Sequence, residues 1–471
     1  MAEEFNFAKE LSAISDPQAL RFIERLVSHF NERIQKLEEE VASLKRDSST
    51  SSKPPSSDIT KPSSEQRQPG KRSRGGQKGR QGKMRTRFSE DEIDRREVLM
   101  LCHCPDCGEA LSEVKKDTII HQIVELPKKP VEIIEYHQVG KECPRCRVHH
   151  YPKLPEGAIE GQLFGVRLQA LIGYMKGALG ASYTELELFC RDVLSIEVSR
   201  GMLCNVVNRA SEALEVPYED LKDTIPQQKH LNIDETGWRD SGKGHWVWVF
   251  CNQLIAFFTI SASRGSRVLK EVLGESFSGA ITTDFFSAYI AYANEKQQFC
   301  LAHLIRDIKF LIMLPDQRTK LFAEKLLKYF RSLFKLWHRR KEYPDQVFHK
   351  KVTRIKNSIS THIARSPFPK GTKAHTLQRR ILKRWKGLFM FTEKQDLYQP
   401  TNNEAERTLR HIIRIRKQTQ GSVSNAGQRW NERIATTLET CKKQNRSAWG
   451  FLIDSLIAQY NSKNYPSLSA V

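Results

Sequence analysis

Two short apolar runs in the sequence each end in an aspartate. Leu231-Asn232-Ile233 leads into Asp234, and Ala280-Ile281-Thr282-Thr283 leads into Asp284. A later segment, Asn403-Glu404-Ala405-Glu406, places two more acids where a helix is expected. Carboxylates within a few ångströms repel by about 4 kcal/mol per pair at an effective dielectric constant near 20, so they stay ionised together only around a cation. These acids are therefore candidates for one metal site.

Their chemistry would be metal-assisted attack on a phosphate. Mg²⁺ prefers oxygen ligands and keeps several waters, so a few carboxylates and DNA phosphate oxygens can complete its shell. Two such ions, about 3.5–4 Å apart, activate the attacking oxygen and stabilise the leaving oxygen at phosphorus. We predict that Asp234, Asp284 and one of two glutamates, Glu404 or Glu406, bind two Mg²⁺ ions, with Mn²⁺ as an alternative.

The elements expected around the aspartates would hold them side by side. The pattern predicts a strand before Asp234, antiparallel strands at 246–250 and 255–260, a helix after Ser263-Arg264-Gly265, and a strand before Asp284. This is the order of the ribonuclease-H-like fold, in which the first and fourth strands are neighbours. The third acid should then come from a later helix. Glu235 and Asp240 are further acids that the pattern does not wholly exclude.

Four cysteines form two Cys-x-x-Cys pairs, Cys104 with Cys107 and Cys143 with Cys146. Alternating segments at 118–126 and 131–139 predict a β-hairpin between the pairs. Four thiolates arranged tetrahedrally leave no open position on Zn²⁺, so we expect a zinc ribbon with a structural ion. Cys102, His149 and His150 are close enough in sequence to be alternative ligands, and isolated Cys190 and Cys204 are expected in the core.

The N-terminal segment carries a heptad repeat whose eight seam positions are all apolar. β-branched residues and leucine at these positions favour a parallel two-stranded coiled coil, so we expect a homo-oligomer that is at least a dimer. The alternative is an amphipathic helix packed on its own domain. The seam residues are Leu20, Ile23, Val27, Phe30, Ile34, Leu37, Val41 and Leu44.

A segment rich in Ser, Pro, Gly, Lys and Arg follows the heptads. Between Lys53 and Arg87 it has 11 basic and two acidic residues, and it has too few apolar residues to fold alone, so we expect disorder. Glycines allow close approach to a DNA backbone while the cations displace its counterions. The alternative is a solvated linker. The candidate DNA-binding residues are Lys71, Arg72, Arg74, Lys78 and Arg80.

The composition of the whole chain agrees with a polyanionic partner. Its 471 residues include 76 Lys and Arg against 55 Asp and Glu, a net charge of +21. This excess favours nucleic acid and says nothing about the fold. The sequence has no apolar signal segment and no stretch of roughly 20 apolar residues that could span a membrane. We therefore expect a cytoplasmic protein with a nucleic acid as its partner.

Between Gly161 and Thr224 the apolar spacing is helical. One helix face contains Leu168, Leu171, Ile172 and Met175, and glycines end it at 177–180. A second helix is expected over 183–193, and Ser199 can cap a third. The second and third helices could form a helix-turn-helix that enters the major groove, or the unit could serve packing alone.

On several of these motifs the chain resembles the bacterial insertion-sequence transposases of the family numbered sixty-six. The resemblance covers the N-terminal helix, Ser51-Ser52-Lys53-Pro54-Pro55-Ser56-Ser57-Asp58 with Gly75-Gly76-Gln77, and the cysteine pairs. It continues through Asp234-Glu235-Thr236, Asp284, Cys300-Leu301-Ala302-His303 with Arg306, and Asn402-Asn403-x-Ala405-Glu406-Arg407. Two positions depart from the family pattern: Lys78-Gly79-Arg80 replaces Pro-Gly-His, and Thr401 stands where an Asp is common.

The resemblance implies a DDE transposase that cuts and joins DNA at the terminal inverted repeats of its element. It chooses Glu406 over Glu404 as the third acid, and it implies a mainly helical insertion between Asp284 and that glutamate. Double-stranded DNA, both at the element ends and as target, and accessory proteins of the same element become expected partners, and the resemblance implies a bacterial, nucleoid-associated protein. Further candidate DNA contacts are His303, Arg306, Arg407 and Arg410.

The sequence thus predicts a multidomain α+β chain with a ribonuclease-H-like DDE catalytic core (α/β) and a helical insertion, preceded by a coiled coil, a zinc ribbon and a helical domain. The expected divisions are the N-terminal helix and coiled coil (1–47), basic linker (48–98), zinc ribbon (99–158), helical DNA-binding-like domain (159–226), catalytic domain (227–440) with its insertion at about 311–395, and C-terminal helical tail (441–471).

Two other functions remain open at this point. The first is a catalytically silent, transposase-derived DNA-binding regulator, against which the intact triad argues. The second is a ribonuclease-H-like nuclease that cleaves DNA without joining it. Metal-dependent cleavage separates the transposase from the regulator, and strand transfer separates it from the nuclease.

Overall fold

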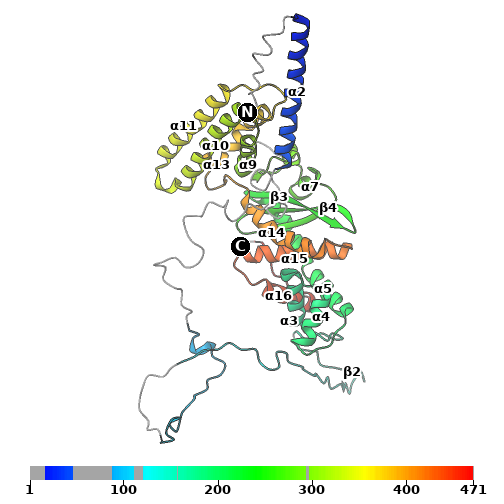
Figure 1. The fold of residues 1–471 in the computed structure, drawn as a ribbon. Helices are drawn as coiled ribbons and strands as arrows, with labels where there is room; N and C mark the ends of the chain where they lie inside the picture. The colour runs from blue at the N-terminus through cyan, green and yellow to red at the C-terminus, as the bar shows by residue number, and fades with distance from the viewer. Residues whose placement is uncertain (1–15, 46–86, 111–119, 156, 293–295, 470–471) are drawn as a thin grey trace. The chain divides into compact units, whose positions relative to one another are not determined.

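The computed structural model describes residues 16–45, 87–110, 120–155, 157–292 and 296–469. The chain divides into two compact units. The larger contains residues 1–59 and 136–471, and the smaller contains residues 60–135. The central sheet, the predicted acids and most helices belong to the larger unit (Figure 1).

The centre of the larger unit is a five-stranded mixed sheet in the order β5-β4-β3-β6-β7. Strands β3, β4 and β5 are antiparallel neighbours, whereas β6 and β7 run parallel to β3. The strands are β3 (His230–Asp240), β4 (Lys243–Cys251), β5 (Ala256–Ser261), β6 (Ala280–Thr283) and β7 (Gln297–Phe299). As expected from the sequence, the strands that carry or precede the two aspartates are adjacent: Asn232 of β3 lies opposite Thr282 of β6.

Helix α14 (Asn403–Thr419) covers one face of this sheet. Its apolar residues Leu409 and Ile412 share a core with Val247 and Val249 of β4. Successive residues of a strand point to opposite faces of a sheet, so β4 divides its aromatic and aliphatic side chains between two layers. On the other face, Trp248 packs edge-on against Tyr289 of α8 (Ser287–Tyr292). The helix α7 (Arg267–Leu273) connects β5 to β6.

Helix α15 (Asn425–Lys443) lies along the free edge of β5 and satisfies its backbone. Thr440 Oγ1 accepts the Ala256 N–H at 3.1 Å and donates to its carbonyl oxygen at 3.0 Å. One helical turn earlier, Thr436 Oγ1 accepts the Phe258 N–H at 3.0 Å. Four helical residues rise about 6.0 Å and two strand residues about 6.6–6.8 Å. The two periods match closely enough for a third contact from Glu432, which accepts the Ile260 N–H at 2.6 Å.

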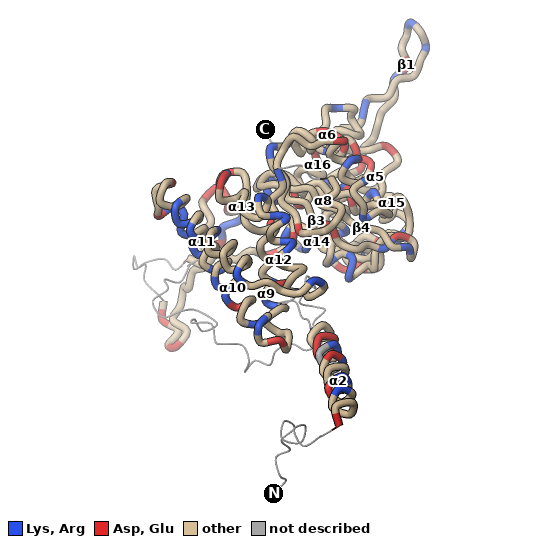
Figure 2. The backbone as a smooth tube through the Cα atoms, turned by 90° about the horizontal axis from the view of Figure 1, so that it is seen from above, with Lys and Arg blue, Asp and Glu red and all other residues tan. Residues whose placement is uncertain are grey.

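Five helices between β7 and α14 form a second hydrophobic core. Lys and Arg recur along α10 and α11 (Figure 2). Because α9 packs on α10 and α13 packs on β7, this helical group is joined to the sheet at its β7 edge. The helices are α9 (Leu301–Ile312), α10 (Gln317–His338), α11 (Asp345–Ala364), α12 (Lys373–Lys383) and α13 (Trp385–Glu393).

A helical unit precedes the sheet in the chain. It consists of α3 (Val166–Tyr174) with a π-helical extension (Met175–Leu179), α4 (Tyr183–Asp192), α5 (Arg200–Ala213) and α6 (Glu215–Thr224). The predicted break and cap are present: Gly180 has φ 78°, and Ser199 Oγ accepts the Met202 N–H at 3.2 Å. Helix α5 packs against α3, α4, α15 and α16. Most of its surface is therefore covered, which favours the packing role over insertion into a DNA groove.

The C-terminal helices differ from the expected separate tail at 441–471. Helix α15 continues through residue 440 to Lys443, and α16 (Ala448–Asn461) packs against α3 and α5. The apolar side chains of α16, such as Phe451, Leu452 and Leu456, are buried. The chain's end therefore completes the helical unit, because α3 and α5 need a further layer to cover their apolar faces.

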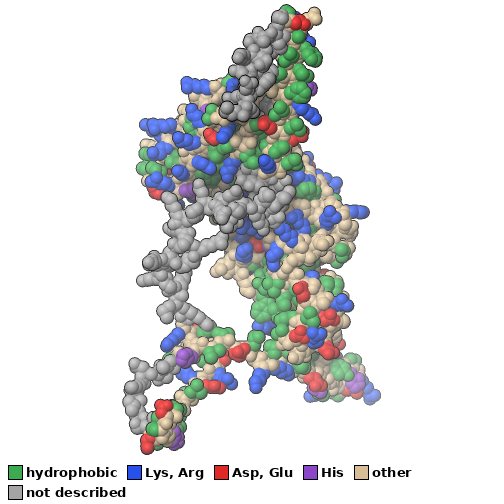
Figure 3. Space-filling model, in the orientation of Figure 1, with side chains coloured by type: hydrophobic (Ala, Val, Ile, Leu, Met, Phe, Trp, Pro, Cys, Tyr) green, Lys and Arg blue, Asp and Glu red, His purple; other side chains and the backbone are tan. Residues whose placement is uncertain are grey.

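The N-terminal heptads form one helix, α2 (Pro17–Leu44). Asp16 caps it by accepting the Gln18 N–H at 2.8 Å, and proline occupies the first turn, where no N–H is needed. Five of the eight seam residues are exposed, namely Phe30, Ile34, Leu37, Val41 and Leu44. Hydrophobic side chains are visible along this helix in Figure 3. Residues 46–86, which include the candidate DNA-binding cations of the linker, lie outside the described residues.

The hairpin predicted between the cysteine pairs is not formed. Thr118 and Ile119 lie outside the described residues, and the described residues 120–140 contain no strand. Their apolar side chains, such as Ile123, Val124 and Ile133, are exposed, and a two-stranded hairpin without a covering layer is only marginally stable. Instead, each cysteine pair has its own short antiparallel pairing: His103 with Ala110, and β1 (Lys141–Glu142) with β2 (His149–His150).

No helix in the described parts of the chain combines the length and apolarity needed to cross a membrane.

Candidate active site on the central sheet

Asp234 lies on β3 and faces helix α14. It is paired across the sheet with Val249, whose side chain is in the core beneath that helix, and directly opposed residues point to the same face. Its Oδ1 accepts the Glu235 N–H at 3.0 Å. Burial raises the pKa of Asp234 well above its ordinary value, and the negative charges of Glu235, Asp284 and Glu406 raise it further. The acids predicted from the sequence thus share one electrostatic environment.

Asp284 follows the end of β6, next to β3. Its Oδ1 accepts the Phe286 N–H at 2.8 Å, which fixes the turn after the strand. Burial raises the pKa of Asp284 to about 6, with a further increase from the charges of Glu235 and Glu406. The Phe286 N–H and the Arg264 guanidinium oppose this shift. At neutral pH the site therefore holds an ionised carboxylate against the preference of its surroundings.

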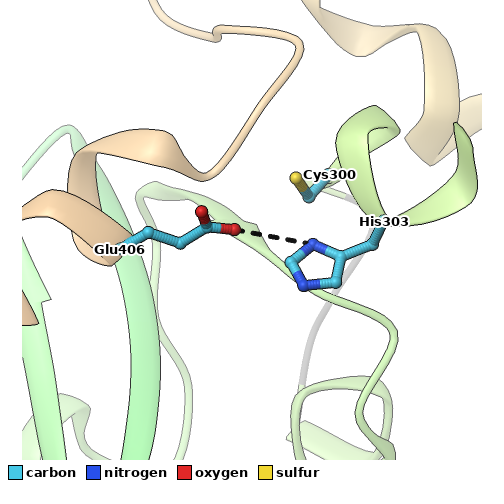
Figure 4. A group of neighbouring side chains, drawn as sticks. All are labelled: Cys300, His303 and Glu406. Carbon is cyan, nitrogen blue, oxygen red and sulfur yellow. Dashed lines mark ion pairs between the residues drawn. The ribbon is translucent and has the colours of Figure 1, made fainter. Parts of the chain in front are cut away.

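Glu406 lies in the first turn of α14 and points toward His303 of α9 (Figure 4). Its Oε1 is 3.9 Å from His303 Nδ1, and its Oε2 is 3.8 Å from Arg306 Nη2. Both Glu406 Oε1 and His303 Nδ1 are buried without a hydrogen-bond partner among the described residues. Burial lowers the pKa of His303 to about 4, and the charges of Arg306 and Arg380 lower it further, so this imidazole is neutral at pH 7.

Glu404, the alternative to Glu406 in the sequence, points elsewhere. It forms ion pairs with Arg407, at 2.6 Å, and with Lys443 of α15. These two cations lower the pKa of Glu404 despite its partial burial. Its interactions therefore join α14 to α15, whereas Glu406 faces α9 and the aspartates.

The other acids near the site also have partners of their own. Glu235 is on the opposite face of β3 from Asp234 because it pairs with Trp248. Arg264 donates to its Oε1 at 2.8 and 3.0 Å, and the Tyr289 hydroxyl donates to its Oε2. Asp240 accepts a hydrogen bond from Ser422 at the far end of β3. Glu235 still matters to the site, since its charge raises the pKa of both aspartates.

Arg264 is held between two aromatic rings. Its guanidinium lies 4.2 Å from the Trp246 ring centroid and 4.1 Å from that of Phe286. Cation–π contacts of this kind fix the plane of a guanidinium. The arginine is thereby aimed at Glu235 and counters part of the negative charge around Asp284.

Asn402, just before α14, joins three elements of the site and is completely buried. Its Nδ2 donates to the Ile233 carbonyl at 2.8 Å, and its Oδ1 accepts from Asn232 at 2.9 Å. Its backbone N–H reaches Cys300 Sγ at 3.2 Å. These contacts fix the start of α14 against β3 and against the start of α9. The sequence motif that contains this asparagine did not predict these contacts.

The residues present fit a cation with oxygen ligands. Three carboxylates influence one another's charge, and burial leaves an oxygen of Glu406 without a hydrogen-bond donor. Carboxylate oxygens suit Mg²⁺. Within the described residues, the ligand atoms of Cys300, His303 and Glu406 lie within 4.8 Å of one another, a group that does not contain the aspartates. Glu406 is thus turned toward α9.

The remaining predicted DNA contacts are distributed differently. Arg407 and Arg410 are exposed on α14, and Arg407 is paired with Glu404. His303 and Arg306, one helical turn apart on α9, are beside Glu406. The structure therefore brings two of these four residues into the candidate active site.

Each cysteine pair has the local geometry of a metal-binding turn. The Gly108 N–H donates to the Cys104 carbonyl at 2.9 Å, and the Arg147 N–H donates to the Cys143 carbonyl at 2.8 Å. Hydrogen bonds from the backbone N–H groups of Cys107 and Asp106 lower the pKa of Cys104. Those of Cys146 and Arg145 lower the pKa of Cys143 in the same way. Such thiolates suit Zn²⁺. The two pairs belong to different units, so a shared ion stays a prediction.

The segment of the chain that matches a known protein family contains most of these helices and strands. A family model described as "Transposase IS66 family" matches residues 161–429, a range that includes the whole sheet and the start of α15. A second model, described as a family of unknown function, matches residues 9–86. A search of curated proteins gave no match.

Proposed function

The chain belongs to the IS66 transposase family, and on that premise we propose that it cuts DNA at the ends of its element and joins those ends to target DNA through Asp234, Asp284 and Glu406. The observation that carries this proposal is the shared environment of the carboxylates, in which burial raises the pKa of both aspartates and the charge of Glu406 raises each of them further.

The sheet supports a ribonuclease-H-like catalytic core. Three antiparallel strands precede a helix and two further strands, and β3 pairs with β6 at the centre. Strands β3 and β6 pair in parallel with Asn232 opposite Thr282, so Asp234 within β3 and Asp284 just after β6 each follow that pair by two residues and can act on one phosphate. Helix α14 then supplies the third acid from the layer above. Helices α10 to α13 form the insertion between them.

Two Mg²⁺ ions, when bound, would activate the attacking oxygen and stabilise the leaving oxygen. Asp234, Asp284 and Glu406 are the residues that would hold them. Arg306 and the neutral His303 are placed to contact the phosphate once Glu406 turns toward the aspartates. The Arg264–Glu235 pair keeps the loop after β6 in position, because Arg264 also stacks on Phe286.

Other parts of the chain would bring DNA and a second subunit to this site. The exposed apolar seam of α2 supports a parallel coiled-coil dimer, and the cysteine turns support structural Zn²⁺. Contacts to the DNA backbone are proposed for the linker residues Lys71, Arg72, Arg74, Lys78 and Arg80, and for Arg407 and Arg410 on α14.

The test is cleavage of a duplex that carries the inverted repeat found beside the gene. Asp234→Asn, Asp284→Asn and Glu406→Gln should each lower Mg²⁺-dependent nicking by about 10³-fold or more, equivalent to about 4 kcal/mol, while DNA binding remains. Glu404→Gln is the matched control on the same helix and should still nick.

Nicking by all three variants would refute the assigned acids. Binding of the duplex by the wild-type protein without any nicking in Mg²⁺ or Mn²⁺ would instead indicate the regulator, and nicking without strand transfer would indicate a nuclease.

A further inference from the structure

A pocket of about 570 Å³ lies between α9, α10 and the turn before α14. This volume falls within the range of roughly 300–1,000 Å³ that is typical of ligand sites. Thr401 and Asn403, the residues on either side of the buried Asn402, form one wall. The pocket therefore lies next to the candidate active site.

The walls of the pocket are cationic. Arg306 and Lys309 come from α9, and Arg331 and Lys335 come from α10, and no acidic side chain lines the pocket. Within the described residues, no ion pair involves Lys309, Arg331 or Lys335. Four positive charges around one hollow attract an anion to it. The walls thus suit a phosphate.

The floor of the same pocket is apolar. Phe334 and Ile305 line it, and both pack at their inner sides against the core of the helical insertion. A groove that only follows a phosphate backbone gains nothing from an aromatic floor. An aromatic side chain beside cations is instead the arrangement on which an unpaired base stacks. The combination points to a nucleotide taken out of its duplex.

The pocket is continuous with the reacting centre through Arg306. This arginine lines the pocket, and its Nη2 is 3.8 Å from Glu406 Oε2. A phosphate held by Arg306 is therefore close to the phosphate at the carboxylates. The nucleotide that fits the pocket is one adjacent to the cleavage point.

We propose that this pocket receives one unstacked nucleotide of the DNA strand next to the phosphate that is cut, with its phosphate against Arg306, Lys309, Arg331 and Lys335 and its base on Phe334. The inference rests on the proposed function, because it takes the carboxylates as the place of cleavage. Holding the nucleotide outside the duplex would expose the neighbouring phosphate to the site.

The first test locates the unstacked base with 2-aminopurine, whose fluorescence rises when it leaves a base stack. The probe is placed in turn at each position around the cleavage point, and the full-length protein is added without divalent metal so that the strand stays intact. One position should show a several-fold rise. A mismatch opposite that same position should tighten binding, because no base pair has to be broken. A flat scan would overturn the proposal.

The second test assigns the pocket. The triple variant Lys309→Gln, Arg331→Gln, Lys335→Gln should lose the fluorescence peak and lower the slope of log affinity against log salt by about one to two units. The control triple variant Lys325→Gln, Lys350→Gln, Arg354→Gln removes the same charges from exposed positions on α10 and α11, and it should keep the peak. Equal effects of both triple variants would mean long-range attraction only and would refute the pocket.

The variant Phe334→Leu tests base stacking separately from phosphate binding. Leucine keeps an apolar floor and the fold, but it removes the stacking surface, so DNA affinity should fall by roughly 5- to 100-fold. Unchanged affinity and an unchanged peak would refute base stacking there. The two failures can be told apart: wild-type nicking with a flat scan defeats only this inference, whereas a peak without nicking defeats the proposed function and leaves only base binding in the pocket.

Discussion

Two buried carboxylates in this protein are surrounded in opposite ways. Glu432 of α15 is 1% exposed and has donors around both oxygens: the Ile260 N–H at 2.6 Å, the Thr259 hydroxyl at 3.3 Å and Arg429 at 2.7 Å. Asp234 of β3 accepts one hydrogen bond, from the neighbouring backbone, and its nearest charged groups are other acids.

Under the proposed function, the difference separates a structural use of buried charge from a catalytic one. Burial raises the pKa of both groups, but cations and N–H donors oppose the shift at Glu432, whereas Glu235 and Asp284 add to it at Asp234. A buried charge is tolerated when hydrogen bonds and an opposite charge replace its water. At the sheet edge the protein supplies these itself. At the centre the charges around Asp234 are negative, and under the proposed function a bound cation would balance them, so this region should be less stable until a cation binds.

The largest expected change in stability is at the sheet edge. Glu432→Ala should lower the free energy of unfolding by about 2–3 kcal/mol, because it leaves the buried Ile260 N–H without an acceptor and Arg429 without its partner. Urea unfolding followed by circular dichroism measures this loss. DNA nicking at low temperature, where the variant is still folded, should match wild type; a loss of nicking under those conditions would contradict the separation of the two regions.

At the centre of the sheet, removing a charged carboxylate should raise the free energy of unfolding, whereas Glu432→Ala should lower it. Without divalent metal at pH 7.5, Asp284→Asn should raise the free energy of unfolding by about 1–3 kcal/mol. The carboxyl ionises near pH 3.8 when unfolded and near pH 6 when folded. Between these values the folded state keeps a proton that the unfolded state has lost, so stability falls as pH rises through this range. Each pKa unit corresponds to about 1.36 kcal/mol.

The pH dependence and a metal titration check this second prediction. The advantage of Asp284→Asn should be complete above pH 6 and disappear near pH 4. Added Mg²⁺ should stabilise the wild-type protein more than the variant. A variant that is less stable than wild type at pH 7.5 without metal would show that the charge is already compensated by the protein.

Asn402 is a hydrogen-bonded polar residue beside the predicted acids. Its contacts with the Ile233 carbonyl and with Asn232 hold the start of α14, which carries Glu406, against β3. Asn402→Ala should lower the rate of nicking by about 10- to 100-fold, as expected when a group that orients a metal ligand is lost. The affinity for DNA should stay the same, which a general loss of folding would not give. Asn357→Ala, at an exposed position of α11, is the control. An Asn402→Ala variant with a normal nicking rate would show that Glu406 is positioned without these hydrogen bonds.

The smallest effect concerns a single contact along β5. Thr436→Val keeps the shape of the side chain but removes the acceptor of the Phe258 N–H. We expect a loss of about 1 kcal/mol in unfolding free energy and no change in nicking. A loss as large as that of Glu432→Ala would mean that the contacts along this edge act as one cooperative unit.

Local patterns in the sequence predicted local structure well. The heptads predicted α2, Ser199 was recognised as a cap, and apolar runs that end in aspartates predicted adjacent strands. These features depend on neighbouring residues and on the periods of helix and strand, which a sequence shows directly. The family resemblance supplied the preference for Glu406.

Other features depend on contacts between distant residues, which no local pattern contains. Glu404 and Glu406 are two positions apart, and only the places of Lys443 and Arg306 show which way each one points. The alternating segments between the cysteine pairs predicted a hairpin, but among the described residues apolar side chains of these segments, such as Ile123 and Ile133, are exposed. The spacing of Glu432, Thr436 and Thr440 resembles an ordinary polar helix face, although all three are buried against β5.

The position of α15 along β5 also bears on what a shortened chain would do. An open strand edge is a template on which another chain can add a strand, and this leads to aggregation. A protein that ended after α14 would retain all three acids, yet it would expose the N–H groups of Ala256, Phe258 and Ile260. Such a product should precipitate before it could compete with the full-length protein for DNA.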